Sequence, residues 1–404
     1  MDRTWQRYGN RLGRVSRLLI ALAMACMGSV TAQQPARIVA ADSPSANATV
    51  IATGLNGPRG LKFGPDGNLY VAEAGTGGKT STVGMCEQVA GPVGPYSGGK
   101  TARISRIATD GTRTTVVDGL PSAISSLPSG DTEGAADVAF IGTTLYALVA
   151  GGGCSHGVPD VPAGVIRVNA DGTWTLVADY SAYTMAHPVQ SPPMDDFEPD
   201  GTPYGMLVGD GTLYVTEANH TELTRIAPDG TITRVVEQSA EPWEGFTGLA
   251  FAGGNLYTGS LTEFPVKQGA AKIWKITPGG QVITVAHGLT AVVSVALDNL
   301  GQLYALEFST QDNAMPTPGT GEVVRVTSSG ELETIASGLS VPTAMTFGPD
   351  GNLYVSNFGA APPGAGQIVR IAVAPPAFAP ASAPTALHIG DGARSAVIRR
   401  LGEG

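Results

Sequence analysis

A nine-residue stretch, FGPDGNLYV, occurs twice without change, at Phe63–Val71 and at Phe347–Val355. Two identical stretches so far apart indicate a duplicated unit, and the period of that unit constrains the fold. Each copy is typical of a β-hairpin, in which a Pro-Asp-Gly turn follows one short strand and Leu-Tyr-Val begins the next. The Leu-Tyr pair of this second strand recurs in six places, with its tyrosine at Tyr70, Tyr146, Tyr214, Tyr257, Tyr304 and Tyr354. The chain therefore contains six repeats.

Each repeat has the pattern of four short antiparallel strands. The strand before the tyrosine strand reads RGLKF in the first repeat and TAMTF in the last, with small and large side chains in alternation. A third strand such as ISRIATDG and a fourth such as TRTTVVDGL follow a loop of variable length. Six units of four antiparallel strands predict an all-β protein with the fold of a six-bladed β-propeller.

The last repeat lacks a fourth strand, because the chain becomes proline-rich after Val373. The missing strand is expected near the start of the chain, where Ala48–Leu55 (ATVIATGL) matches the fourth strand ELETIASGL of the fifth repeat. This N-terminal strand would complete the last blade and close the ring. Closure removes the free sheet edges that an open array of blades would expose.

The chain divides into three segments. Residues 1–32 have the features of a signal peptide, namely five arginines, a short apolar run at Leu18–Met27 and small residues before Gln33. The apolar run is too short to span a membrane, and Cys26 leaves a lipoprotein anchor open as an alternative. Residues 43–374 are expected to form the propeller, and the Pro- and Ala-rich residues 375–404 a disordered tail. We therefore expect a secreted, extracellular protein.

The charge balance limits the partners of such a protein. The formal net charge is −10, and only 14% of the residues are charged, with no basic run after the leader. This composition does not favour nucleic acid or anionic membranes. We expect no nucleic-acid partner and no membrane span, and a monomer whose partner is an extracellular ligand or protein.

The longest insertions fall on one face of the expected propeller. The turns after first and third strands are short, whereas the largest insertions follow second and fourth strands, at Gly75–Lys100, Gly151–Gly164 and Ser181–Pro203. Long loops on a rigid scaffold often form binding sites. Cys86 and Cys154 lie in two of these loops, and because disulfides persist in exported proteins we expect them to be joined. The alternative is two free thiols.

The same face collects the candidate site residues. Those that end the second strands of their repeats are Glu73, Glu217, Glu307 and Asn357. Glu133 and Glu244 precede first strands, and Arg59 begins one. Carboxylates around one axis could hold a divalent cation such as Ca²⁺, although no cofactor is certain. The alternative is a set of solvated carboxylates that accept hydrogen bonds from loop backbone, with Arg59 in a salt bridge or facing an anionic ligand.

The long loops also contain three histidines close to acidic residues. These residues are His156, His187, His220, Asp195, Asp196 and Glu198. Imidazole and carboxylate together are metal-ligand chemistry, but their spacing is irregular, so histidines on the surface are the expectation. The sequence has no nucleophile elbow, phosphate loop, zinc-protease or dinucleotide-binding motif. Catalytic residues are therefore not assigned, and whether the protein is an enzyme stays open.

Two longer runs carry a family resemblance, GLNGPRGLKFGPDGNLYVAEAGTGG at 54–78 and GLSVPTAMTFGPDGNLYVSNFG at 338–359. Together with the glutamate-rich face, they resemble the ScyD/ScyE family of secreted six-bladed propellers with NHL-like repeats. The resemblance implies an extracellular module that binds a ligand or a protein. It implies no assigned catalysis and no catalytic residues.

The Glu133-Gly134 and Glu244-Gly245 steps suggest an alternative function. They are similar to the Glu-Gly-Pro step that carries a metal-ligand carboxylate in propellers of the regucalcin and gluconolactonase type. This similarity implies a metal-dependent hydrolase or lactonase with its site at the mouth of the central channel.

Overall fold

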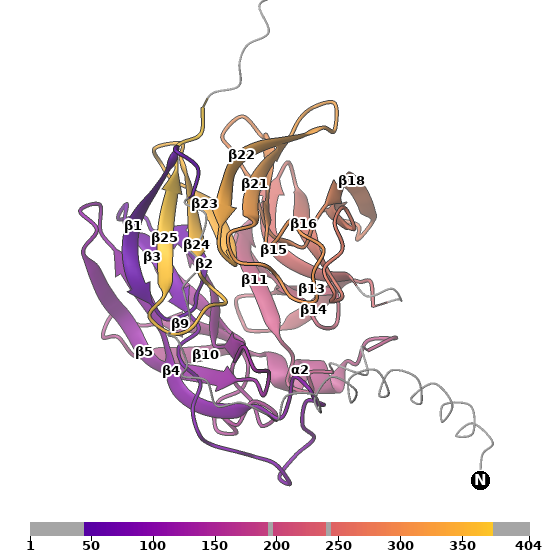
Figure 1. Cartoon of the computed structure of the whole chain (residues 1–404). Coiled ribbons are helices and arrows are strands. Elements are labelled where there is room, and N and C mark those ends of the chain that lie inside the picture. Colours follow the sequence, from indigo (N-terminus) through magenta and orange to yellow (C-terminus); the bar gives the residue numbers. More distant parts are fainter. Residues whose placement is uncertain (1–43, 193–196, 240–243, 375–404) are drawn as a thin grey trace, which may run out of the picture. The chain divides into compact units, whose positions relative to one another are not determined.

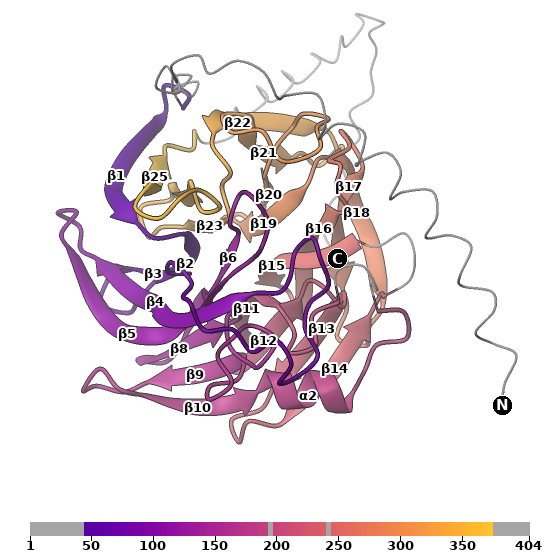
Figure 2. The same cartoon turned by 60° about the horizontal axis from the view of Figure 1, so that its bottom comes forward.

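The computed structural model describes residues 44–192, 197–239 and 244–374. The signal peptide and the tail expected at 1–32 and 375–404 lie outside the described residues. Six β-sheets form the blades of a six-bladed β-propeller, which confirms the predicted fold (Figures 1 and 2). The first strands of neighbouring blades contact one another around the whole ring, so they form the wall of a central channel.

The strands of each blade follow one another in the chain, except in blade 6. Blade 1 contains β2 (Pro58–Phe63), β3 (Leu69–Glu73), β4 (Ser97–Ile107) and β5 (Arg113–Ile124). Blade 2 contains β7 (Ala135–Ile141), β8 (Thr144–Val149), β9 (Gly164–Val168) and β10 (Trp174–Asp179). Blade 3 contains β11 (Pro203–Gly209), β12 (Thr212–Glu217), β13 (Glu222–Ile226) and β14 (Ile232–Glu237). Blade 4 contains β15 (Glu244–Ala252), β16 (Asn255–Thr262), β17 (Ala271–Ile276) and β18 (Val282–Leu289). Blade 5 contains β19 (Val292–Leu297), β20 (Leu303–Glu307), β21 (Gly321–Val326) and β22 (Leu332–Leu339).

Blade 6 is completed by the N-terminal strand. It contains β23 (Ala344–Phe347), β24 (Leu353–Asn357), β25 (Gly366–Ile371) and, as its outer strand, β1 (Ala48–Leu55). β1 and β25 are antiparallel, with Ala48 opposite Ile371 and Leu55 opposite Gly366. In Figure 1 the first and last parts of the described chain accordingly lie side by side in this blade. The prediction that the N-terminal strand closes the last blade is confirmed.

Blade 1 departs from the four-stranded pattern. A short fifth strand, β6 (Thr132–Glu133), pairs with the end of β5, with Glu133 opposite Ala123. β4 and β5 are also the longest strands, at 11 and 12 residues. Their extension supports the chain between blades 1 and 2, and it determines where Glu133 lies.

Each copy of the duplicated stretch forms a hydrogen bond within its own turn, and the second copy also contacts blade 1. Asp66 Oδ2 accepts a hydrogen bond from the Tyr70 hydroxyl at 3.0 Å, and in the second copy Asp350 accepts one from Tyr354 at 3.1 Å. The ring of Tyr354 also meets the ring of Phe63 in blade 1 edge to face, with 4.9 Å between their centres. Edge-to-face aromatic pairs contribute to stability beyond the area they bury. The identity of the two copies therefore has a structural reason.

Small side chains line the channel at one level of the first strands. The six residues at the second position of this strand pattern are Gly60, Asp137, Gly205, Gly248, Ser294 and Ala344. A Cβ at Gly60 would lie 1.9 Å from Asp137 Oδ1, so only glycine fits there. Asp137 Oδ1 accepts from Val138 N and Oδ2 from Met206 N, both at 2.8 Å. This carboxylate therefore binds blade 2 to blade 3.

The long loops of blades 1 and 2 are covalently joined. Cys86 and Cys154 form a disulfide across 68 residues of sequence, with 6.3 Å between their Cα atoms, as predicted. The insertion after blade 2 contains a short helix that the repeat pattern does not predict, α2 (Tyr180–Ala186), which begins where Asp179 Oδ1 accepts from Ala182 N. None of the described residues forms a helix long and apolar enough to cross a membrane.

Candidate functional site

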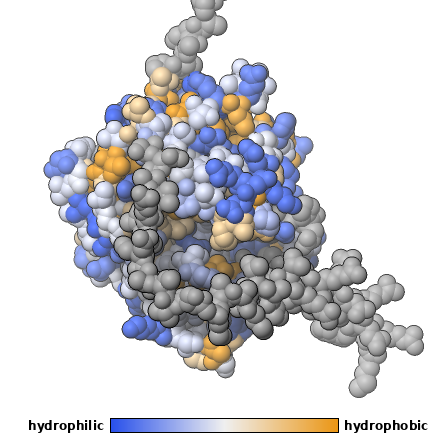
Figure 3. Space-filling model, in the orientation of Figure 1, coloured by the Kyte–Doolittle hydropathy of each residue, from blue (hydrophilic) through white to orange (hydrophobic). Residues whose placement is uncertain are grey.

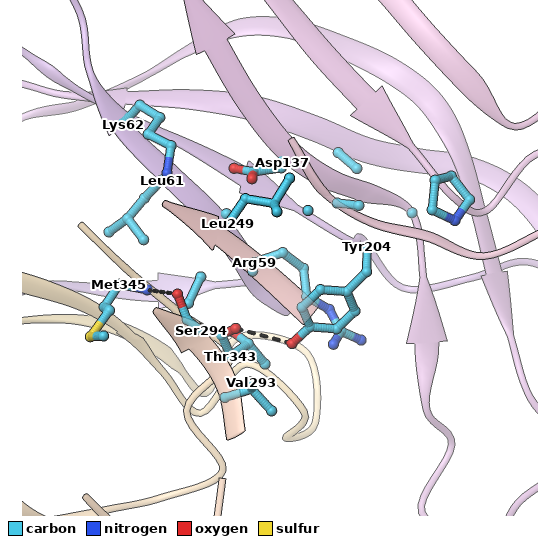
Figure 4. A pocket seen from close by; sticks show the side chains of 18 of the residues that line it. Arg59, Leu61, Lys62, Asp137, Tyr204, Leu249, Val293, Ser294, Thr343 and Met345 are labelled. Carbon is cyan, nitrogen blue, oxygen red and sulfur yellow. Dashed lines mark hydrogen bonds between the residues drawn. The ribbon is translucent and has the colours of Figure 1, made fainter. Parts of the chain in front are cut away.

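The channel contains a cavity toward the long-loop face, with a volume of about 50 Å³. Figure 4 shows the side chains that surround it, among them Arg59 of β2, Tyr204 of β11 and Thr343, which precedes β23. The Tyr204 hydroxyl donates a hydrogen bond to Thr343 O at 3.2 Å. Because blades 3 and 6 are opposite in a ring of six, this bond spans the channel.

Arg59 lies beside Tyr204 and is already held by the chain around β6. Its Nη2 donates to Thr132 O at 2.7 Å and lies 3.3 Å from Asp131 Oδ1. The side chain is 15% exposed, and Arg59 is among the residues that line the cavity. The salt bridge expected for Arg59 is therefore present, with an aspartate that the sequence pattern did not single out.

Glu133 and Asp137 are the acidic residues that line this cavity. Both oxygens of Asp137 already accept backbone N–H bonds, whereas none of the described residues donates a hydrogen bond to the carboxyl of the partly exposed Glu133. Burial raises the pKa of Glu133 to about 7; Arg59 opposes the shift, and the charges of Asp131 and Glu198 reinforce it. A carboxyl with a pKa near neutrality exchanges its proton at physiological pH, as acid–base groups and ligand-binding groups do.

A buried cluster of polar groups from three loops lies near Glu133. His156 Nε2 is 3.1 Å from Glu198 Oε2, and Glu198 Oε1 accepts from the Tyr96 hydroxyl at 3.2 Å. Asp200 Oδ2 accepts from both N and Oγ of Ser155 at 2.7 Å. Burial acts to lower the pKa of His156, but Glu198 and the further acids Glu133 and Asp200 raise it above its ordinary value.

The expectation that the loop histidines lie on the surface is wrong for two of the three. His156 is 0% and His220 is 2% exposed, because the long loops fold over one another instead of extending into solvent. His187 is exposed at the end of α2. Asp195 and Asp196 lie outside the described residues.

Four of the predicted site residues form hydrogen bonds within their own blades and do not line the cavity. They are buried and accept a hydrogen bond from a backbone N–H in the segment that leads into the first strand. The pairs are Glu73 with Asn56 at 2.8 Å, Glu217 with Thr202 at 2.5 Å, Glu307 with Thr290, and Asn357 with Ser340 at 2.8 Å. The interpretation as carboxylates bonded to loop backbone describes these contacts, except that the groups are buried and not solvated.

Burial also raises the pKa of two of these four residues, Glu217 and Glu307. The pKa of Glu217 is raised by burial, against the charge of His220. Burial and the neighbouring Glu322 raise the pKa of Glu307 to about 8. Glu73 is instead paired with Arg103, whose Nη2 lies 2.8 Å from its Oε2.

Glu244, the counterpart of Glu133 in blade 4, makes an ion pair within its own sheet. Its Oε1 lies 2.6 Å from Lys272 Nζ, and it does not line the cavity. Of the predicted residues, only Arg59 and Glu133 are therefore brought together at the channel mouth. Among the described residues, no group of three or more His, Cys, Asp or Glu side chains is arranged to hold a metal ion.

Similar solved structures support the fold. No family model matches the sequence, and no curated protein matches it. A protein of unknown function from Bacteroides thetaiotaomicron is 12% identical, with 81% of this chain and 76% of that chain covered and a TM-score of 0.50. A putative oxidoreductase (glucose dehydrogenase) from Thermus thermophilus is 18% identical, with 80% and 99% covered and a TM-score of 0.50. A gluconolactonase from Xanthomonas campestris is 13% identical, with 80% and 89% covered and a TM-score of 0.49.

At these identities, the likenesses concern the fold alone. The chain is a six-bladed β-propeller protein. Since propellers host many activities, the fold does not determine the function of this one, and the residues at its channel mouth are the relevant evidence.

Proposed function

We propose that the protein is an extracellular binding module of the ScyD/ScyE type that holds a polar end group of its ligand at the channel mouth. The observation that carries this proposal is Glu133, which lines the cavity and whose carboxyl has no hydrogen-bond donor among the described residues. A carboxyl in such surroundings is costly to leave unpaired. A ligand that donates hydrogen bonds would satisfy it.

The surrounding groups restrict the chemistry of that ligand. The Tyr204 hydroxyl gives its proton to Thr343 O, so its oxygen is left as an acceptor, like Glu133. Arg59 is the donor on the same side. The acceptors Glu133 and Tyr204, with Arg59 as a donor beside them, favour hydroxyl or amino groups, as in sugars and amino sugars. The small cavity admits one end group, and the long loops would contact the remainder.

The disulfide between Cys86 and Cys154 supports the extracellular part of the proposal, because such bridges persist in oxidising compartments. It also ties together the two loops that contribute Tyr96 and His156. The loops around the mouth are thereby fixed before a ligand arrives, which lowers the entropic cost of binding.

Calorimetric titration tests the proposal with a panel of neutral sugars, amino sugars and polyamines, at a pH above the pKa of Glu133. We expect at least one to bind, and Glu133→Gln to weaken it by about tenfold or more, since a hydrogen bond to a charged group contributes that much. The matched control is Glu263→Gln, which removes the same charge from an exposed site. Failure of the whole panel to bind, or equal affinity in Glu133→Gln, would refute the proposal.

A hydrolase of the lactonase type is the second candidate, and the near-neutral pKa of Glu133 favours it. Glu133 would exchange a proton with the substrate, with Arg59 as the neighbouring cation. The described residues do not supply a metal-ligand group, so no step through a metal ion follows. Turnover of simple lactones, measured with and without Ca²⁺, Mg²⁺, Mn²⁺ or Zn²⁺ and lost in Glu133→Gln, is the expected result. Absence of turnover under all of these conditions contradicts this candidate.

A further inference from the structure

The channel has a second cavity at its other end, toward the short turns that follow the first strands. Its volume is about 320 Å³, several times that of the cavity at the long-loop mouth. Most of the residues that line it are of apolar type, among them Leu207, Phe251, Leu297 and Phe347 from blades 3 to 6. Cavities of about 300 Å³ and larger are the usual size of small-molecule sites.

Lys62 is the charged residue in the lining of this cavity. It occupies the fourth position of the first-strand pattern, where the other blades have Ala139, Leu207, Ala250, Ala296 and Thr346. Lys62, Leu249 and Met345, which are labelled in Figure 4, line both cavities. Lys62 therefore lies where the two cavities adjoin.

This lysine has neither an ion pair within 4.0 Å nor a hydrogen bond at its Nζ among the described residues. The nearby acid is Asp137, where the charge of Lys62 opposes the rise in pKa that burial causes. Both oxygens of Asp137 already accept backbone N–H bonds, from Val138 and Met206. An ammonium without a direct partner, on a half-buried lysine beside apolar side chains, is a place where an anion is stabilised.

We infer that this second cavity binds an organic monocarboxylate with an apolar body. The carboxylate would accept hydrogen bonds from Lys62 Nζ, and the hydrocarbon would contact Leu207, Phe251, Leu297 and Phe347. A compact, strongly hydrated dianion such as phosphate suits this site less well, because Lys62 is the single charged residue of the lining that could replace its water. A neutral hydrocarbon leaves the ammonium unpaired. Binding of the carboxylate here does not require the ligand proposed for the long-loop mouth, although Lys62 lines both cavities.

Titration calorimetry with octanoate tests the inference on the full chain. We expect saturable binding of octanoate, and no comparable binding of octylammonium, which has the same body and the opposite charge, or of acetate, which lacks the body. Lys62→Met keeps an apolar side chain of similar length and should weaken octanoate binding by about tenfold or more. Lys275→Met is the matched control, since it removes the same charge from β17, away from either cavity.

The test does not depend on a single variant. If Lys62→Met does not fold, the comparison of octanoate with octylammonium on the wild type decides, together with the retention of binding in Lys62→Arg. Octanoate that does not bind, octylammonium that binds as tightly, or equal affinity in Lys62→Met would each overturn the inference. Failure at this site leaves binding at Glu133 untouched, and the reverse also holds.

Discussion

At the scale of single residues, environment and not position in the repeat decides what an acidic side chain does. Glu133 and Glu244 occupy matching places in blades 2 and 4, but Glu244 has Lys272 beside it, 2.6 Å from its Oε1. Glu133 has Arg59 nearby, which is already engaged with Thr132 O and Asp131. The result is one paired carboxylate and one carboxyl with a raised pKa.

The raised pKa of Glu133 predicts a pH-dependent stability. The folded protein holds this proton up to about pH 7, whereas the unfolded chain releases it near 4.5, so the stability that the protonated form contributes is lost as the pH rises through this range. Relative to Glu133→Gln, the wild type should lose on the order of 2 kcal/mol of unfolding free energy across that range. Urea denaturation at a series of pH values measures the difference. Parallel curves for the two proteins would contradict the assigned pKa.

The sequence predicts less at this scale than it does for the fold. The repeat places Glu73, Glu217 and Glu307 on the long-loop face, but it does not determine whether a carboxylate turns to the channel or back to its own blade. The backbone N–H groups that attract them belong to segments about one strand away. His156 and Glu198 lie in two loops whose lengths do not follow the repeat, so the period of the sequence does not predict their contact.

At the scale of elements, the pattern of strands was predictable because each blade repeats the same chemistry. The alternation in RGLKF and TAMTF reflects inner strands that pack against the next blade, and the Asp–Tyr bond in the turn recurs in both copies of the duplicated stretch. β6 and α2 were not predicted, because each lies in an insertion that has no counterpart in the other repeats.

The close approach of the inner strands predicts a strong effect of one methyl group. Gly60→Ala would place a Cβ 1.9 Å from Asp137 Oδ1, so a strand or the carboxylate must move. We expect a loss of about 1–3 kcal/mol in the free energy of unfolding. Gly279→Ala is the control, since its nearest atom is 4.0 Å away. Equal melting temperatures for the two variants would show that the inner strands are not tightly packed.

The strand that closes the ring can be tested as an element. Deletion of Ala48–Leu55 exposes the edge of β25, and we expect aggregation or a much lower melting temperature. A circularly permuted chain in which residues 44–55 follow Ala374 restores the same strand through a different connection, and should melt close to the wild type. An unchanged melting curve for the deletion would argue against closure by β1.

At the scale of the whole molecule, the disulfide joins parts of two blades that the sheets alone do not connect. Cys86 belongs to the insertion of blade 1 and Cys154 to that of blade 2, so the bridge closes a loop of 68 residues. In the chain-entropy model, a loop of this size stabilises the folded state by about 4 kcal/mol. Reduction, or Cys86→Ser with Cys154→Ser, should lower the melting temperature accordingly. Intact-mass measurement of two alkylatable thiols in the native protein would contradict the bridge.

The union of β1 with β25 also has a consequence for how the protein is made. β1 is the first described strand to leave the ribosome and β25 is the last, so blades 1 to 5 can form while the ring is still open. Until β25 is synthesised, β1 and β24 each lack the strand that pairs with them. Such unpaired strand edges are templates for association with other chains. A product that stops before Gly366 keeps both edges for its lifetime. Premature termination late in the chain should therefore yield an aggregating protein and not a slightly shortened one.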